Sequence, residues 1–342
     1  MERWWMYAGF TAFVLVMLAL DLGVFNRKAH AVRAREAAIW TGVWVSLAMV
    51  FAFFLYRWMG REAALQFLAG WLVEKSLSVD NIFVFILVFG YFGVPPRYQH
   101  RVLFWGILGA LVMRGAMIAA GAVLLERFHW LLYVFGAFLI YTGVRMARQG
   151  EREMDMETQP VLRFVRARLP ITGEYHGQRF FVRCPGPDGK PKRYVTPLFI
   201  VLIVLETTDL VFAVDSIPAV FAVTRDPFLV YTSNVFAILG LRSLYFLLAD
   251  VVTRFHLLKV GLGVVLCFVG AKMLLEDVVE VPIGISLAVI ATVIGGSVAL
   301  SILFPRQAKE TDVTPPTAEA KADAAREAAE EATHPTTPRD AA

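Results

Sequence analysis

The sequence predicts an all-α fold: a polytopic transmembrane helix bundle of about nine spans that contains an inverted three-helix repeat. Composition gives the first indication, because 58% of the 342 residues are hydrophobic and only 18% are charged. That is more apolar than a soluble domain requires. Run length gives the second, since several apolar runs approach the roughly 20 residues that cross a bilayer. The third is a set of motifs that recurs in the same order in two segments.

Apolar runs, separated by charged residues, prolines and glycines, define the expected spans. They cover residues 6–26, 39–58, 65–92, 101–125, 129–147, 195–223, 228–250, 256–275 and 281–304. The third and sixth runs are long enough to be tilted or interrupted. The runs give an N-terminal two-helix segment (1–64), a first three-helix repeat (65–147), a loop (148–194), a second three-helix repeat (195–275), a final helix (276–305) and a tail (306–342).

Loop charges predict the orientation of the spans, because Lys and Arg accumulate in cytoplasmic loops. The connection after the first span and the loop over 148–194 are both strongly basic. We therefore expect a multi-pass membrane protein with its N-terminus outside and, after nine spans, its C-terminus in the cytoplasm. The N-terminal residues lack the basic region and cleavage site of a signal peptide, so we expect the first run to be retained.

The polar segments carry weaker signals. Two β-prone runs flank a Pro-, Gly- and Asp-rich turn within 148–194 and predict a hairpin, whereas residues 306–342 contain few large apolar residues and are expected to be disordered. Cys184 and Cys267 have no metal-binding spacing. The positive-inside pattern accounts for the net charge of +4, so we expect no nucleic-acid partner. No nucleophile triad, phosphate-binding loop or zinc signature is present, and we expect neither an enzyme nor a resident cofactor.

Four landmarks recur at an offset that drifts only from 135 to 127 residues. Each repeat has three spans, and an odd number of spans places successive copies in opposite orientations. Inverted repeats of this kind hold substrate at the membrane midplane in secondary transporters. The landmarks are a pair of acids (Glu74 and Asp80; Asp209 and Asp215), an arginine (Arg114; Arg242), Arg-Phe-His (127–129; 254–256) and a basic residue before methionine (145–146; 272–273).

Acids inside the spans are the candidate functional residues, because an intramembrane carboxylate costs several kcal/mol unless a partner or a task offsets it. Six acids against three bases leave a charge of −3, which protons or a bound cation must neutralise. Alternatively, each acid pairs with a base and only locks helices together, or the two arginines bind an oxyanion. The acids are Asp21, Glu74, Asp80, Glu206, Asp209 and Asp215, and the bases are Lys75, Arg114 and Arg242.

Helix geometry limits how these acids can meet. Residues six apart lie about 120° around a helix, so Glu74 and Asp80 would converge only if the helix were broken. Pro218 predicts one break, which would free the carbonyl of Val214 beside Asp215. Carboxylate, amide and hydroxyl oxygens suit Mg²⁺, Ca²⁺ and Mn²⁺, whereas we expect His129 and His256 to be interfacial. The predicted metal ligands are Glu74, Asp80, Asn81, Glu206, Asp209, Asp215 and Ser216, with Asp21, Lys75, Arg114 and Arg242 as supporting charges.

Over the stretches 74–81 and 212–219, and in shorter motifs at 21–22, 180–183, 196–198 and 232–242, the sequence resembles the TerC/Alx family of bacterial inner-membrane proteins, and more closely its Alx branch. The likeness extends to about residue 305. It implies metal-ion homeostasis, chiefly export of manganese from the cytoplasm, with links to tellurite resistance and alkaline stress. It also implies that the intramembrane acids lie on the transport path.

We therefore expect a secondary transporter that exports a divalent metal ion, with Mn²⁺ as the transported ion and proton antiport as the coupling. Its expected partners are the metal ion and the lipid bilayer. Sequence alone leaves Ca²⁺, Mg²⁺ and the oligomeric state open. One alternative is a non-transporting membrane organiser of a stress response, of the tellurite-resistance type, which docks partners through the loop over 148–194. The other is an exporter of a different cation or of an oxyanion.

Overall fold

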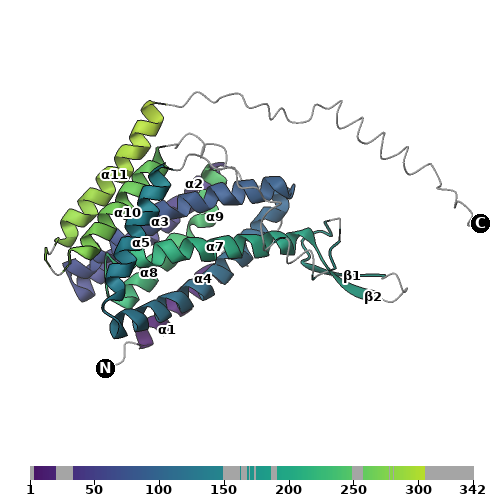
Figure 1. Cartoon of the computed structure of the whole chain (residues 1–342). Helices are drawn as coiled ribbons and strands as arrows, with labels where there is room; N and C mark the ends of the chain where they lie inside the picture. The colour runs from purple at the N-terminus through teal and green to yellow at the C-terminus, as the bar shows by residue number, and fades with distance from the viewer. Residues whose placement is uncertain are drawn as a thin grey trace, which may run out of the picture. The chain divides into compact units, whose positions relative to one another are not determined.

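The computed structural model describes residues 4–20, 34–148, 162, 168, 170–172, 175–185, 191–248, 257–276, 278–279 and 281–304 (Figure 1). Asp21, His256 and the tail over 306–342, all of which carry predictions, lie outside the described residues. The elements are α1 (Trp4–Leu20), α2 (Ala34–Met59), α3 (Arg61–Tyr91), α4 (Pro96–Arg127), α5 (Leu131–Arg148), β1 (Phe181–Pro185), β2 (Pro191–Val195), α7 (Pro197–Phe221), α8 (Pro227–Leu239), α9 (Leu241–Leu248), α10 (Leu258–Leu274) and α11 (Ile283–Leu303).

Six helical segments within the described residues are long and apolar enough to cross a membrane: most of α2, then α4, α5, α7, α8 together with α9, and α11. α1 and α10 have 17 residues each, slightly fewer than the roughly 20 that a bilayer requires. α3 has 31 residues, but Glu74, Lys75 and Asp80 interrupt its apolar stretch. The protein is thus an all-α, multi-pass membrane protein. A helix overlaps each of the nine predicted runs, and the number of spans stays a prediction.

The helices are interrupted at a different place from the one predicted. α3 and α7 are both continuous, and Pro218 lies inside α7 without ending it. Residues 216–221 of α7 are all buried, so packing from neighbouring helices holds the turn around the proline in place. The break falls instead at Gly240, between α8 and α9. The expectation that helices would be broken beside the acids is therefore wrong for both α3 and α7.

A lysine marks the break at Gly240. Nζ of Lys75 donates to the carbonyl oxygen of Ala237, near the end of α8, at 3.2 Å. A Cβ atom on Gly240 would lie only 2.5 Å from the same Nζ, so a larger residue at this position would force the end of the lysine side chain to move. An ammonium group in a membrane interior needs oxygen partners, and the end of an interrupted helix supplies one.

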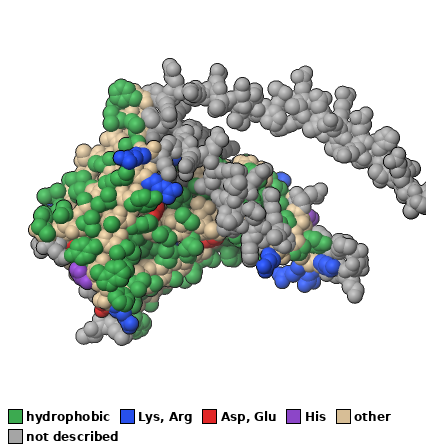
Figure 2. Space-filling model, in the orientation of Figure 1, with side chains coloured by type: hydrophobic (Ala, Val, Ile, Leu, Met, Phe, Trp, Pro, Cys, Tyr) green, Lys and Arg blue, Asp and Glu red, His purple; other side chains and the backbone are tan. Residues whose placement is uncertain are grey.

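α3, α7 and α8 form the centre of the bundle. α3 packs against both α7 and α8, while α4 packs against α7 and runs beside it in Figure 1. Nearly every residue of α8 is buried. The outer helices differ, because Phe53 on α2 is 64% exposed and Val112 on α4 is 71% exposed. Hydrophobic side chains cover much of the visible face of the bundle in Figure 2. Such a large exposed apolar surface fits contact with lipid.

α5 and α10 meet along a seam of glycines. A Cβ on Gly143 would lie 2.6 Å from the carbonyl oxygen of Gly263, and a Cβ on Gly263 would lie 2.6 Å from that of Gly143. Gly136 and Gly270 oppose each other in the same way. A Cβ on Gly136 would lie 3.0 Å from the carbonyl oxygen of Gly270, and a Cβ on Gly270 would lie 2.6 Å from that of Gly136. Backbones that approach this closely leave no room for side chains, which is how small residues pack membrane helices. This glycine seam holds α5 and α10 together.

A two-stranded hairpin precedes α7, in the segment where the sequence predicts one. β1 and β2 pair antiparallel, with Arg183 opposite Arg193. The ring of Phe181 lies 4.6 Å from that of Phe199 on α7, which anchors the hairpin to the start of that helix. The Tyr175 hydroxyl donates to the carbonyl of Phe92 at 2.5 Å, and burial raises the pKa of this hydroxyl, so the hydroxyl keeps its proton at physiological pH. Figure 1 shows the hairpin projecting beyond α4 and α7.

Candidate functional site

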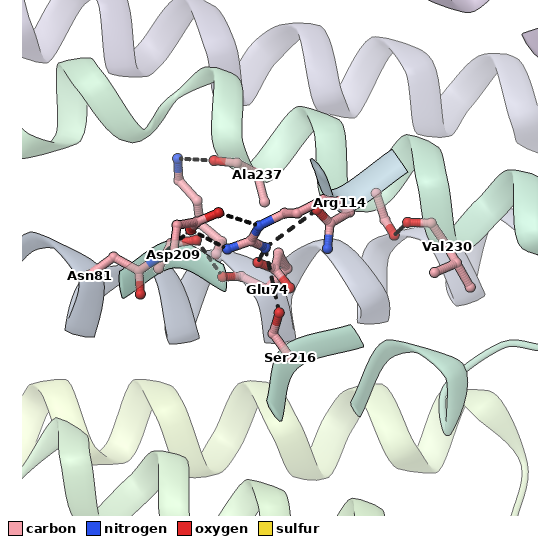
Figure 3. A network of polar contacts seen from close by, with 11 residues as sticks. Glu74, Asn81, Arg114, Asp209, Ser216, Val230 and Ala237 are labelled. Atoms are coloured by element: carbon pink, nitrogen blue, oxygen red, sulfur yellow. Dashed lines mark hydrogen bonds and ion pairs between the residues drawn. The ribbon is translucent and has the colours of Figure 1, made fainter. Parts of the chain in front are cut away.

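A buried arginine, Arg114 of α4, stands at the centre of the polar residues inside the bundle (Figure 3). Its side chain is 2% exposed. The guanidinium donates from Nε to Oδ2 of Asp209 at 3.0 Å and from Nη2 to Oδ1 of Asp209 at 2.7 Å. Nη1 donates to Oε1 of Glu74. One guanidinium thus binds carboxylates from both α3 and α7. Its fork geometry fixes the positions of the carboxylates, and its positive charge compensates part of theirs.

Three further side chains complete the arginine cluster. Asn81 of α3 donates through Nδ2 to Oδ1 of Asp209 at 3.2 Å. Ser216 of α7 and Asn234 of α8 each place an oxygen 3.4 Å from Nη1 of Arg114. The cluster therefore joins α3, α4, α7 and α8. Its members are Glu74, Asn81, Arg114, Asp209, Ser216 and Asn234.

Helix geometry explains how these residues meet without a break. Glu74 and Asn81 are seven residues apart on α3, and Asp209 and Ser216 are seven apart on α7. Seven residues make almost two full turns, so each pair lies on one face of its helix. The six-residue spacing of the acids, on which the prediction relied, does not have this property. The residue after each second acid is the one that aligns with the first acid, and the sequence contains that signal.

A small cavity, the Asp215 cavity, lies beside the arginine cluster. It has a volume of about 20 Å³, enough for about one water molecule or one metal ion. Within the described part of the chain, Oε2 of Glu74 and Oδ1 of Asn81 are buried and have no hydrogen-bond partner. A buried acceptor left unpaired costs about 1–3 kcal/mol, so these oxygens favour a guest that donates a hydrogen bond or carries positive charge. The cavity is lined by Glu74, Leu77, Asn81, Arg114, Met146, Phe212, Asp215 and Ser216.

Asp215 supplies a second carboxylate to this cavity. It lies one residue before Ser216 on α7 and is partly buried. The Thr142 hydroxyl and the Arg145 guanidinium of α5 lie near it. Arg145 is exposed at the end of α5, so its charge is partly shielded by its surroundings. The Asp215 cavity therefore has carboxylates on two sides, one held by Arg114 and one facing α5.

Glu206 is separated from the Asp215 cavity and lines a second one, the Glu206 cavity. This space is also about 20 Å³ and is walled mainly by apolar residues of α3, α4, α7, α8 and α9. Asp209 and Arg242 are its other charged residues. Nη1 of Arg242 lies 3.2 Å from Nε2 of His100. Asp209 lines the Glu206 cavity and also binds Arg114, which lines the Asp215 cavity. Asp209 therefore lies between the two cavities.

The acids whose side chains the structure describes do not gather into one cage. Among the described residues, no group of three or more His, Cys, Asp or Glu side chains is arranged to hold a metal ion. The physical reason is Arg114, whose guanidinium takes the central position between Glu74 and Asp209. The predicted supporting charge Lys75 bonds to the backbone of α8 and not to an acid. Asp80 lies in α3, but its side chain is outside the described part. His129 is exposed between α4 and α5.

Sequence reasoning missed three contributors to the site. Asn234 faces Arg114 from α8, and the polar triplet 232–234 inside an apolar span is the signal that could have identified it. Thr142 lies near Asp215, although nothing in its local sequence indicates this. Gly109 of α4 lies against the carboxyl group of Glu206, and only the packing of α4 on α7 reveals that contact.

Comparison with known proteins gives one family. A family model described as the integral membrane protein TerC family matches residues 59–309. An uncharacterized membrane protein of Myxococcus xanthus, STKORF319, is 51% identical over 311 residues, which is 91% of this chain and 96% of the relative. No solved structure gives a significant match.

Two further relatives carry a functional name. Each is described as "Putative membrane-bound redox modulator Alx". The Salmonella typhi protein is 50% identical over 294 residues, which is 83% of this chain and 90% of the relative. The protein of Escherichia coli K12 is 49% identical over the same length and the same shares.

Proposed function

The chain belongs to the TerC family of integral membrane proteins, and we propose that it exports a divalent metal cation from the cytoplasm through the Asp215 cavity, with Mn²⁺ as the preferred ion. The protein carries out no chemical reaction in this proposal, and the metal is its substrate. The observation that carries the proposal is the pair of buried oxygens that have no partner among the described residues, Oε2 of Glu74 and Oδ1 of Asn81, on a cavity that Asp215 and Ser216 also line.

The charges around the cavity favour a cation. Glu74 and Asp209 share one guanidinium, which leaves one negative charge, and Asp215 adds a second that the exposed Arg145 offsets only in part. Uncompensated carboxylates at this depth persist only when a positive partner is available. Arg114 is committed to both of its carboxylates, so it has no free side for an anion. This arrangement disfavours the oxyanion alternative.

The available oxygens also indicate the kind of cation. Both oxygens of Asp209 accept from Arg114, so its role is to hold the arginine. The groups left for an ion are the free oxygens of Glu74 and Asn81 together with Asp215 and Ser216. These are hard oxygen ligands, which suit Mg²⁺, Ca²⁺ and Mn²⁺ in preference to soft-metal ions. The choice of Mn²⁺ among them rests on the family resemblance.

An inverted repeat of α3–α5 and α7–α10 provides the frame in this proposal. The motif offset pairs Gly136 with Gly263 and Gly143 with Gly270. The contacts across the glycine seam join Gly136 to Gly270 and Gly143 to Gly263. Exchanging the two repeats converts one contact into the other, as a two-fold axis between α5 and α10 requires. The contacts of α3 with α8 and of α7 with α4 are exchanged in the same way.

The proposed topology has nine spans in the bacterial inner membrane, with the N-terminus outside and the C-terminus in the cytoplasm. The hairpin supports this orientation, because Arg183, Lys192 and Arg193 are exposed on it. Figure 2 shows basic side chains gathered at this end of the bundle. Positive charge of this kind accumulates on the cytoplasmic side, which is the side from which the ion enters.

Metal uptake into inverted membrane vesicles tests the proposal. We expect Glu74→Gln and Asp215→Asn each to reduce Mn²⁺ uptake by at least about tenfold, because each removes a ligand charge worth more than about 1.4 kcal/mol. Glu62→Gln is the matched control, since Glu62 lies exposed on the same helix as Glu74 and should leave uptake unchanged. Equal uptake by all four proteins would remove the Asp215 cavity from the function. Normal stress resistance without metal flux would favour the membrane-organiser alternative.

A further inference from the structure

The β1–β2 hairpin contains a pairing of charges that antiparallel strands normally avoid. Arg183 of β1 lies directly opposite Arg193 of β2. Residues opposite each other in an antiparallel pair share one face, and like charges at such positions destabilise the pair. Both side chains are exposed, at the end of the bundle where basic side chains gather in Figure 2. An anion bound to both arginines would offset their repulsion.

Backbone hydrogen bonds fix the base of the hairpin, so the two arginines have defined positions. The amide of Val195 donates to the carbonyl oxygen of Pro170 at 2.9 Å, and the carbonyl oxygen of Val195 accepts from the amide of Thr172 at 2.9 Å. The hydroxyl of Thr196 donates to the carbonyl oxygen of Arg179 at 2.7 Å. A two-stranded hairpin by itself is only marginally stable, and these bonds supply support. The charged face is therefore built into the fold.

The residues around the hairpin add positive charge to this face. Among the described residues between 168 and 199 there is no Asp or Glu. The first turns of α4 and α7 hold no acid either. An anion at this face therefore meets attraction, and no opposing carboxylate, from these residues. The basic residues of this described stretch are Arg168, Arg179, Arg183, Lys192 and Arg193.

Aromatic side chains connect the charged face with the membrane. Arg193 lies over the ring of Phe181, 5.4 Å from its centroid, and that ring contacts Phe199 in the first turn of α7. Trp105 of α4 is 44% exposed and its ring lies 6.5 Å from that of Phe180, the residue before β1. Exposed tryptophan on an apolar helix is typical of the level at which a bilayer meets water. The two arginines are therefore close to the level of lipid headgroups.

We propose that Arg183 and Arg193 bind the phosphate group of an anionic phospholipid. Guanidinium groups bind phosphate oxygens through paired N–H donors, and basic clusters next to membrane helices bind anionic lipids. A lipid fits better than a soluble anion, because the exposed rings of Phe181 and Trp105 offer apolar surface to its acyl chains. The proposed orientation places this lipid in the cytoplasmic leaflet. The site itself is separate from the Asp215 cavity and does not depend on metal export.

Lipid titration of the purified full-length protein in a non-ionic detergent tests the site. Native mass spectrometry measures the binding of phosphatidylglycerol, with phosphatidylcholine of the same acyl chains as the comparison without net charge. We expect wild type to prefer phosphatidylglycerol, and Arg183→Gln and Arg193→Gln each to weaken its binding about fivefold, as the loss of one cation near a lipid surface predicts. Arg35→Gln is the matched control, because Arg35 is an exposed arginine at the start of α2 on the same proposed side of the membrane. Equal weakening by all three variants would indicate general attraction to charge and overturn the site.

Two further measurements separate a lipid site from other roles of the arginines. A lipid that binds the folded protein raises its unfolding temperature, so we expect phosphatidylglycerol to raise that of wild type and to have much less effect on Arg183→Gln. Without lipid, removal of an opposed like charge should leave Arg183→Gln at least as stable as wild type, and lower stability would give this arginine a structural role and contradict the proposal. Displacement of the lipid by equimolar inorganic phosphate or an acidic peptide would make this a site for a soluble anion and overturn the lipid assignment.

Discussion

The two arginines that occupy equivalent motif positions have different surroundings. Arg114 binds carboxylates from two helices and is 2% exposed, whereas Arg242, 8% exposed, lies beside His100 and the Glu206 cavity. The helices that carry them explain the difference. α4 is continuous through Val112, but the equivalent position in the second half is Gly240, where α8 ends and α9 begins. A repeated motif thus places the same residue type in both halves, while the contacts that the described residues make with the two arginines differ.

Substitution of the two arginines gives the largest expected contrast. Arg114→Gln leaves Glu74 and Asp209 buried with no counter-charge, which typically costs about 3–5 kcal/mol. Arg242→Gln removes the 3.2 Å contact with His100, and a polar contact of this kind contributes about 1 kcal/mol, so we expect the smaller loss here. Thermal unfolding in detergent, monitored by circular dichroism, measures both. Equal destabilisation by the two variants would show that the halves are energetically equivalent at these positions.

The glycine seam should behave in the opposite way, because here the two halves make matching contacts. Gly143→Ala and Gly263→Ala each place a Cβ 2.6 Å from a carbonyl oxygen of the other helix. Overpacking of this kind costs about 1–3 kcal/mol, and we expect the two variants to lose similar stability. Gly9→Ala, whose Cβ meets nothing within 4 Å, is the control in the same unfolding assay. A clear difference between Gly143→Ala and Gly263→Ala would argue against the two-fold relation.

The break at Gly240 gives the smallest of these effects. Gly240→Ala forces Nζ of Lys75 to move, and the hydrogen bond from that group to Ala237 is lost. A single hydrogen bond of this kind contributes about 1 kcal/mol. In a Lys75→Met background the alanine should therefore cost much less, and a double-mutant cycle measures the coupling. Purely additive costs would mean that the lysine does not stabilise the break.

Much of the fold could be predicted from the sequence, because apolar run length is a strong local signal in a membrane protein. Each predicted run overlaps a helix, and the hairpin lies where its turn residues indicate. The predicted break at Pro218 was wrong, since burial on all sides keeps the helix intact around the proline. The break at Gly240 lies against Lys75 from another helix, and local sequence does not contain such a contact.

The site could be predicted only in part for the same reason. The sequence identified the acids and both arginines, and the structure brings Glu74, Asn81, Asp209 and Ser216 together around Arg114. That Arg114 and not an ion stands between the carboxylates depends on the register of α4 against α3 and α7. The contact of the Glu206 carboxyl group with Gly109 likewise appears only when α4 is packed on α7.

The glycine seam has a mechanical consequence. Backbones that touch at two points, Gly136 with Gly270 and Gly143 with Gly263, cannot slide past each other without collision, but they can rotate slightly about their line of contact. α5 and α10 belong to different halves of the bundle, so the seam joins the two halves. If the halves rock as the proposed transport would require, rotation about this line of contact is the movement that the close packing permits, and α3 and α4 would then turn relative to α7, α8 and α9.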